Sequence, residues 1–178
     1  MFKDGWYLGC KHIQSDNYNE RPKSDGVSCD ISLVVIHCIS LPEGEYNNQN
    51  VESLFQNKLD CSLDKGFKSL EGVKVSAHFY IKRSGEIVQF VSVNDRAWHA
   101  GLSSFKGREN CNDFSIGVEM QGTDKTNYEL EQYNSLNTLL KELRKNYPSI
   151  KDIIGHQDIA PVRKTDPGVC FEWWRVSF

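Results

Sequence analysis

The sequence has no long apolar run, no excess of positive charge and no closely spaced pair of cysteines. Its first ten residues, MFKDGWYLGC, contain no apolar run of about seven or more, so we expect no signal peptide. No stretch approaches the roughly eighteen apolar residues of a membrane span. A net charge of −3 and a pI near 6.0 give no basic surface for nucleic acid or anionic lipid. These absences predict a cytoplasmic protein that binds neither nucleic acid nor membrane.

The cysteines and the composition describe an ordinary reduced, globular chain. Six cysteines occur, none in a C-x-x-C pair, and without a secretion signal we expect free thiols rather than a disulfide framework. The chain is 39% hydrophobic and 25% charged, with no internal repeat or long linker. Its 178 residues therefore predict a single domain that spans 1–178.

Three segments have the pattern of β-strands. The run ISLVVIHCIS (31–40) is nearly continuous in apolar residues and predicts a buried central strand. SAHFYIKRSGEIVQFVSV (76–93) contains two strand-like runs joined at Ser84-Gly85, which indicates a hairpin. FSIGVEMQG (114–122) alternates, with an apolar face opposite a second face made of Ser115, Gly117, Glu119 and Gln121.

Helical patterns lie on both sides of the expected sheet. Thr126 and Glu129 have the spacing of a capping box, leucines at helical spacing follow, and Pro148 should end that helix. A weaker pattern covers 51–59, and a final turn is expected at FEWWRV (171–176). The segment 41–73 otherwise shows little periodicity and should contain a mobile loop. Together these elements predict a mixed α/β domain, a central mixed β-sheet flanked by helices.

Five polar residues could form a catalytic site. His37 lies near the end of a buried strand, and the charged loop GHQDIAPVRKTDPG (155–168) contains His156 and Asp166. Two imidazoles and one carboxylate are the ligands of an open zinc site. A carboxylate such as Glu119 could take a proton from water, and a cation such as Lys164 could stabilise an oxyanion. The histidines are far apart in sequence, so residue types alone leave both a zinc site and ordinary structural roles open.

Five motifs carry a resemblance to a known family. LVVIHCISLP, VSAHFYIKRSGEIVQFV, RAWHAG, GRENCNDFSIGVEMQGTD and GHQDIAPVRKTDPG occur in this order, and similarity begins near Gly5 and reaches the C-terminus. The chain closely resembles the cytosolic AmpD-type 1,6-anhydro-N-acetylmuramyl-L-alanine amidases of the type 2 amidase superfamily. That resemblance implies the mixed sheet shared with peptidoglycan recognition proteins.

The resemblance also assigns roles to residues. It implies one zinc ion per chain held by His37, His156 and Asp166, with Glu119 as the catalytic acid–base and Lys164 stabilising the transition state. It implies hydrolysis of the amide between the lactyl group of N-acetylmuramic acid and L-alanine. Its substrates would be small anhydromuropeptides recovered during cell-wall turnover, and we expect a monomer.

Substrate recognition is where the sequence departs from the family. Cys38 stands where the family commonly has Asn, Asn110 where Arg is typical, and Lys74 where Arg is common. An Arg-to-Lys change keeps the charge but loses the bidentate fork for carboxylates. Other expected substrate contacts are Tyr46, Trp98, His99 and Arg108, with pure packing left open for His99. His78 is expected to be a buried structural residue.

Two rival functions remain open from the sequence. A phage-type relative would cut intact peptidoglycan, and the chain has no wall-binding repeat to favour this. A non-catalytic muropeptide-binding module is the other rival, and such binders typically lose the zinc ligands that this chain retains.

Overall fold

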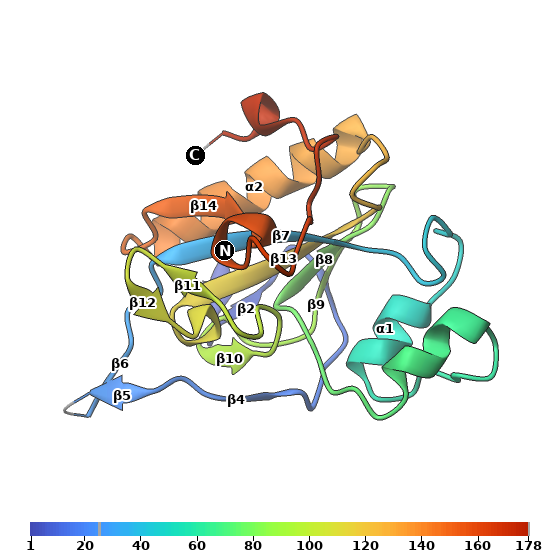
Figure 1. Ribbon diagram of the computed structural model, residues 1–178. Coiled ribbons are helices and arrows are strands. Elements are labelled where there is room, and N and C mark those ends of the chain that lie inside the picture. The colour runs from blue at the N-terminus through green and yellow to red at the C-terminus, as the bar shows by residue number, and fades with distance from the viewer. Residues whose placement is uncertain (25, 178) are drawn as a thin grey trace.

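The computed structural model describes residues 1–24 and 26–177, which are built around a six-stranded mixed β-sheet (Figure 1). In spatial order its strands are β14 (Asp152–Gly155), β7 (Leu33–Ile39), β13 (Ser115–Gln121), β8 (Phe79–Ile81), β9 (Ile87–Gln89) and β3 (Lys11–His12). The first four are parallel, β9 runs antiparallel to β8, and β3 is parallel to β9. The mixed sheet and the fold class expected from the sequence are confirmed.

The two central strands are the longest of the sheet. β7 and β13 pair over seven residues each, and every residue of β13 is buried. The expected strands at 31–40 and 114–122 are therefore confirmed, each slightly shorter than its pattern. The 76–93 hairpin is confirmed as β8 and β9, with Gly85 at φ +83° in the connecting turn. Glu119 lies on a strand with neighbours on both sides, so its backbone is held rigidly.

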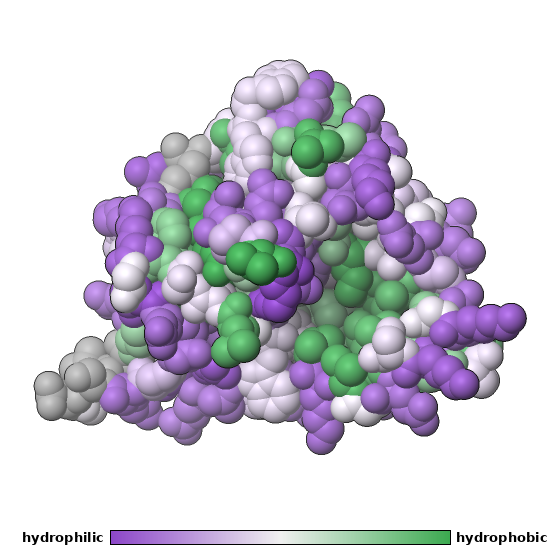
Figure 2. Space-filling view, viewed as in Figure 1, coloured by the Kyte–Doolittle hydropathy of each residue, from purple (hydrophilic) through white to green (hydrophobic). Residues whose placement is uncertain are grey.

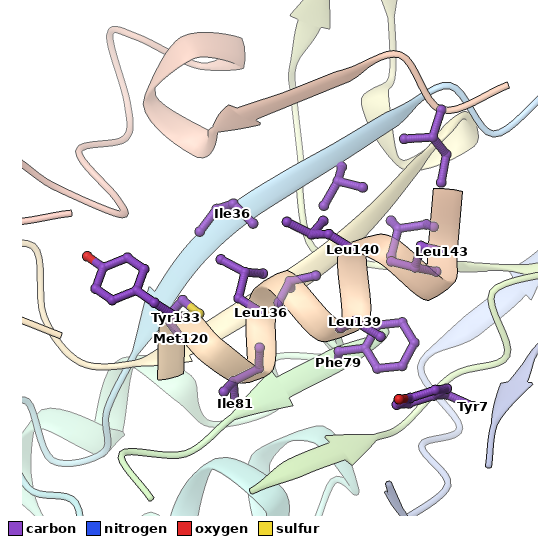
Figure 3. Close-up of a cluster of buried hydrophobic side chains, with 14 of the residues drawn as sticks. Tyr7, Ile36, Phe79, Ile81, Met120, Tyr133, Leu136, Leu139, Leu140 and Leu143 are labelled. Carbon is purple, nitrogen blue, oxygen red and sulfur yellow. The ribbon is translucent and has the colours of Figure 1, made fainter. Parts of the chain in front are cut away.

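One face of the sheet is covered by the long helix α2 (Leu130–Asn146). Its buried face packs onto alternate residues of the strands, as Figure 3 shows for Leu136, Leu140, Ile36, Phe79 and Met120. Burial of such side chains contributes about 1.5–3 kcal/mol each relative to exposure. The residues that alternate with them, His37 and Glu119 included, therefore point to the other face.

The other side of the molecule is built from shorter pieces. The helix α1 (Asn50–Phe55) and the 3-10 helix η1 (Lys65–Leu70) lie beside the ends of β7 and β8, at the right of Figure 1. They pack through a second apolar cluster that contains Leu54, Phe55, Tyr80 and Phe90. The 41–73 segment thus contains two helical turns. The sequence pattern predicted only the first of these, and extended it past its end at Phe55.

The start of α2 differs from the sequence expectation. The N-cap is Glu129, whose backbone N–H donates to the side-chain oxygen of Gln132 at 3.0 Å, so the predicted pair of Thr126 and Glu129 was wrong. The Thr126 hydroxyl instead lies 3.0 Å from that of Thr123 in the preceding turn. Pro148 follows the helix end at Asn146, as expected. The final turn η3 (Trp173–Arg175) is also confirmed.

The remaining elements are short and surround the sheet. They are β1 (Phe2–Lys3), β2 (Trp6–Tyr7), β4 (Tyr18–Glu20), β5 (Lys23–Ser24), β6 (Val27–Ser28), β10 (Asp95–Ala97), β11 (Ser104–Phe105), β12 (Arg108–Glu109), η2 (Cys111–Asp113) and α3 (His156–Ile159). The buried Arg21 follows β4 and donates to the carbonyl oxygens of Val93, Asn112, Asp113 and Ser115. This guanidinium ties the N-terminal segment, η2 and β13 together. Within the described ranges, no helix has the length and apolarity to cross a bilayer.

Candidate active site

Three side chains that could hold a metal ion meet at the carboxyl edge of the parallel strands. His37 lies on β7, and His156 begins α3 directly after β14, the neighbour of β7. The Nδ1 atoms of the two histidines are 2.9 Å apart, and Asp166 Oδ2 lies 3.1 Å from the first and 3.0 Å from the second. Neighbouring ligand atoms around tetrahedral zinc are roughly 3.3 Å apart. The three donors expected from the sequence are therefore brought together.

The proton positions of His156 favour a cation in this cluster. Its Nε2 lies 3.0 Å from the carbonyl oxygen of Ala100, which can only accept, so Nε2 carries the proton. In the neutral ring, Nδ1 is then a lone pair facing the Asp166 carboxylate. Two such acceptors repel each other unless positive charge stands between them, and the donor set therefore fits a metal ion.

The electrostatics of the cluster also suit metal ligation. Burial lowers the pKa of His37 to about 4, so its ring is neutral near pH 7. Burial opposes ionisation of Asp166, but positive charge on the side of His156 and His37 lowers the pKa of its carboxyl below the usual range. Neutral imidazoles and an ionised carboxylate are the protonation states that a divalent metal requires.

Glu119 stands beside this cluster on β13. It is the register partner of His37 across the two central strands, and it is 8% exposed. Its Oε2 is buried without a hydrogen-bond partner among the described residues. Burial, and then the negative charge of Asp166, raise the pKa of Glu119 well above the ordinary value, against the opposing charge of Lys164. A carboxylate with a raised pKa and a free oxygen is suited to accept a proton from water near neutral pH.

The cluster lies at the bottom of a cleft of about 630 Å³, within the usual size range for ligand sites. Lys164 and Glu119 line the same cleft as the three donors. The opposite side is apolar and consists of Leu41, Leu54, Leu70 and Val73, which we call the apolar wall. Figure 2 shows this hollow to the right of centre, with apolar surface inside and polar residues around it.

The loop from Gly155 to Gly168 is held by its own polar residues. Asp158 accepts the backbone N–H of Gly155 at 2.7 Å, and Arg163 donates to the carbonyl oxygens of Ala100 and Leu102. At its end, Gly168 has φ +88°, and a Cβ there would lie 2.1 Å from the carbonyl oxygen of Asp124. Only glycine allows this approach, so the loop that contains His156, Lys164 and Asp166 is fixed at both ends.

Three of the residues expected to contact substrate line the cleft. They are Cys38, Trp98 and His99. Burial raises the pKa of the Cys38 thiol to about 12, so it presents a neutral Sγ. Trp98 is anchored by its indole N–H, which donates to Asn19 at 2.7 Å. His99 contacts His37 directly, its Nδ1 lying 2.9 Å from His37 Nε2.

The other four are placed elsewhere. Lys74 lies in a neighbouring hollow behind the apolar wall, and Tyr46 lies in another one under Arg83. Arg108 stacks 3.8 Å from the ring centre of Phe114 and donates to Cys29 Sγ. Asn110 starts η2 in a left-handed conformation with φ 57°. The structure therefore does not bring these side chains to the cleft around the metal-binding cluster.

Sequence reasoning missed the residues that support the site. Asn112 Oδ1 accepts the backbone N–H groups of both His99 and Ala100, and Ser115 is fully buried next to His99. His78 is completely buried and accepts the Gly117 N–H, as expected for a structural histidine. The only signal for Asn112 in the sequence was its place in the GRENCNDF motif.

A mixed sheet with two histidines, a carboxylate, a buried glutamate and a lysine at one edge is typical of the metal-dependent amide hydrolases. The family described as N-acetylmuramoyl-L-alanine amidase matches residues 27–169 of the chain. Because this match covers most of its length, the chain belongs to the N-acetylmuramoyl-L-alanine amidase family.

Individual relatives agree with this assignment. The chain is 47% identical over 173 residues to the 1,6-anhydro-N-acetylmuramyl-L-alanine amidase AmpD of Haemophilus influenzae, covering 96% of this chain and 92% of that protein. A crystal structure of an AmpD derivative superimposes with a TM-score of 0.93 at 43% identity, over 99% of both chains. The amidase AmiD from E. coli, solved with anhydro-N-acetylmuramic acid-L-Ala-D-gamma-Glu-L-Lys, gives a TM-score of 0.61 at 26% identity, covering 90% of this chain and 65% of that one.

Proposed function

We propose that this protein is a zinc-dependent amidase of peptidoglycan recycling. It cleaves the amide between the lactyl group of 1,6-anhydro-N-acetylmuramic acid and L-alanine in small cytoplasmic muropeptides. The name of the Haemophilus influenzae relative and the ligand of the AmiD structure support the substrate class. The observation that carries the proposal is the convergence of His37, His156 and Asp166 beside Glu119 in one cleft.

One zinc ion per chain would be held by His37, His156 and Asp166. When bound, zinc polarises a carbonyl oxygen and lowers the pKa of a water molecule toward neutrality. Both histidines are buried, which restricts movement of their donor atoms.

The chain supplies the acid–base groups. Glu119 takes a proton from the attacking water through its free Oε2, and its raised pKa lets it deliver that proton to the departing L-alanine nitrogen. Lys164, which lines the same cleft, stabilises the negative charge that develops on the amide oxygen. The water oxygen first forms the new C–O bond at the carbonyl carbon, and the C–N bond breaks afterwards, when the nitrogen has received the proton from Glu119.

The apolar wall binds the substrate beside this chemistry. Leu41, Leu54, Leu70 and Val73 cover apolar parts of the muropeptide and exclude water from the reacting amide. Trp98, His99 and Cys38 line the cleft on the side of the metal-binding residues and are the substrate contacts that we retain. We propose that residues 1–178 act as one domain and as a monomer.

Metal removal and substrate comparison test this function. EDTA treatment should abolish release of peptide from anhydromuropeptide, measured by mass spectrometry, and stoichiometric zinc should restore it. Undiminished turnover after complete removal of the metal would exclude a role of zinc in catalysis. Incubation with whole sacculi is the parallel assay. Product from sacculi alone would favour the phage-type activity, and binding without product would favour a muropeptide-binding module.

A further inference from the structure

A hydrogen-bond chain runs from the back of His37 into the interior of the protein. His37 Nε2 lies 2.9 Å from His99 Nδ1, and His99 Nε2 lies 3.3 Å from Ser115 Oγ. Ser115 Oγ in turn donates to the carbonyl oxygen of Cys111 at 2.6 Å. The chain therefore links a candidate metal ligand to a fixed backbone acceptor through two side chains.

The carbonyl oxygen of Cys111, at the end of these hydrogen bonds, determines which atom is the donor in each of them. Because a carbonyl oxygen only accepts, the Ser115 hydroxyl proton points to Cys111, and its oxygen is left to accept from His99 Nε2–H. Among the residues that the structure describes, no carboxylate hydrogen-bonds to His99 to balance a second ring proton, so its Nδ1 is a lone pair. That lone pair accepts the Nε2 proton of His37. The Nδ1 atom of His37 is consequently the unprotonated nitrogen, and it faces His156 and Asp166.

The position of His99 is itself closely determined. Its ring lies over the backbone of β13, where a Cβ on Gly117 would stand 2.4 Å from its Cγ. Its backbone N–H donates to Asn112 Oδ1, which also accepts the N–H of Ala100. The Ala100 carbonyl is the acceptor for His156 Nε2. One short segment, residues 99–100, therefore holds the outer nitrogens of both histidine ligands.

We propose that His99 is a positioning residue that fixes the tautomer and the ring orientation of His37 for metal binding through Nδ1. The proposal rests on the metal-dependent function proposed above and gives His99 a role in addition to substrate contact. Groups that accept the second ring proton of a ligating histidine typically account for 10- to 100-fold in metal affinity. His99 performs this role for His37 with a side chain, whereas Ala100 performs it for His156 with its backbone.

The first test uses the unmodified protein. Nitrogen-15 NMR of the imidazoles in the zinc-loaded protein should show His37 protonated at Nε2 and bound through Nδ1. An unprotonated Nε2 on His37 would overturn the proposal, whatever the outcome for any variant. This measurement does not depend on activity, nor on whether a variant folds.

The second test compares two substitutions at position 99. His99→Phe keeps a ring of similar size without an acceptor, and zinc affinity measured by competition with a chromophoric chelator should fall 10- to 100-fold. His99→Asn places an amide oxygen close to the position of Nδ1, and it should restore affinity to within about threefold of the unmodified protein. Gly117→Ala, which displaces the ring, should resemble His99→Phe. His12→Phe makes the same change at a histidine without a link to the ligands and should have no effect.

Thermal unfolding of each metal-free variant separates positioning from general destabilisation. A merely structural role would lower the midpoint of unfolding in both His99 variants and leave zinc affinity equal in the two, which would overturn the proposal. If the unmodified protein bound no zinc, the metal-dependent function itself would fail. If it bound zinc as tightly as His99→Phe does, only the role of His99 would fail.

Discussion

The two sides of the cleft are built in different ways. On one side, His37 and His156 are each 2% exposed, and both ring nitrogens of each have a defined neighbour. On the other side, the apolar wall comes from the 41–73 segment, and its exposure increases to 37% at Val73. Hydrogen bonds hold the side chains of the first side in place, whereas the second side provides apolar surface for a ligand. Substitutions on the first side should therefore abolish the chemistry, and substitutions on the second should only weaken binding.

The largest effect is expected at Glu119. Glu119→Gln keeps the size of the side chain but removes proton transfer, and kcat should fall about 10²- to 10⁴-fold. Zinc content, measured by atomic absorption, should stay at one ion per chain, because the residue is a neighbour of the three donors and not one of them. Near-normal turnover in this variant would remove the acid–base role, and loss of zinc would show that Glu119 supports the ligands instead.

Lys164 should give the next largest effect. Lys164→Met keeps the apolar stem in the cleft and removes the charge, so kcat should fall about 10²- to 10³-fold, as loss of an oxyanion donor does. KM and zinc content should change little, since its backbone N–H remains bonded to Ala160 and the loop keeps its shape. Lys106→Met, which removes a lysine paired with Asp152, is the matched control. Equal losses in both variants would contradict the role of Lys164.

The same contrast explains what the sequence could predict. Hydrophobic runs and alternation predicted β7, β13 and the β8–β9 hairpin, because burial of a strand requires those patterns. The family motifs assigned five residues to one catalytic site before any coordinates were considered: His37, His156, Asp166, Glu119 and Lys164. By contrast, no sequence pattern singled out Arg21, yet it binds carbonyl groups up to 94 positions away. Contacts of this kind depend on tertiary packing and leave no local pattern.

The sequence also failed to predict the cap of α2 and the direction of several side chains. Both Thr126–Glu129 and Glu129–Gln132 have the spacing of a capping box, and only the packing of α2 decides between them. Motif position likewise suggested that Lys74, Arg108 and Asn110 face the substrate. The structure turns Arg108 onto Phe114 and places Lys74 behind the apolar wall. A motif thus predicts the course of the backbone more reliably than the direction of a long side chain.

A smaller effect is expected on the apolar wall. Val73→Ala removes part of the exposed apolar surface and should raise KM about three- to tenfold with kcat unchanged, the pattern of lost uniform binding. Leu63→Ala removes more apolar surface from the same segment, at a side chain that is 67% exposed and outside the cleft lining. Steady-state kinetics with anhydromuropeptide should show no change for Leu63→Ala. A fall in kcat for Val73→Ala would mean that the wall also orients the reacting amide.

The smallest effect is expected at Arg108, and its measurement tests whether that residue contacts the substrate. In the structure its guanidinium covers Phe114 and bonds to Cys29 and Ser32, away from the cleft. Arg108→Met keeps most of the contact with the ring, so KM and kcat should stay within about twofold and stability should fall by about 0.5–1 kcal/mol, the usual size of an exposed cation–π contact. The comparison should be made with muropeptides that have a free or an amidated peptide carboxylate. A rise in KM confined to the free carboxylate would show that Arg108 leaves Phe114 to bind substrate, and the cleft would then extend beyond the side chains that line it here.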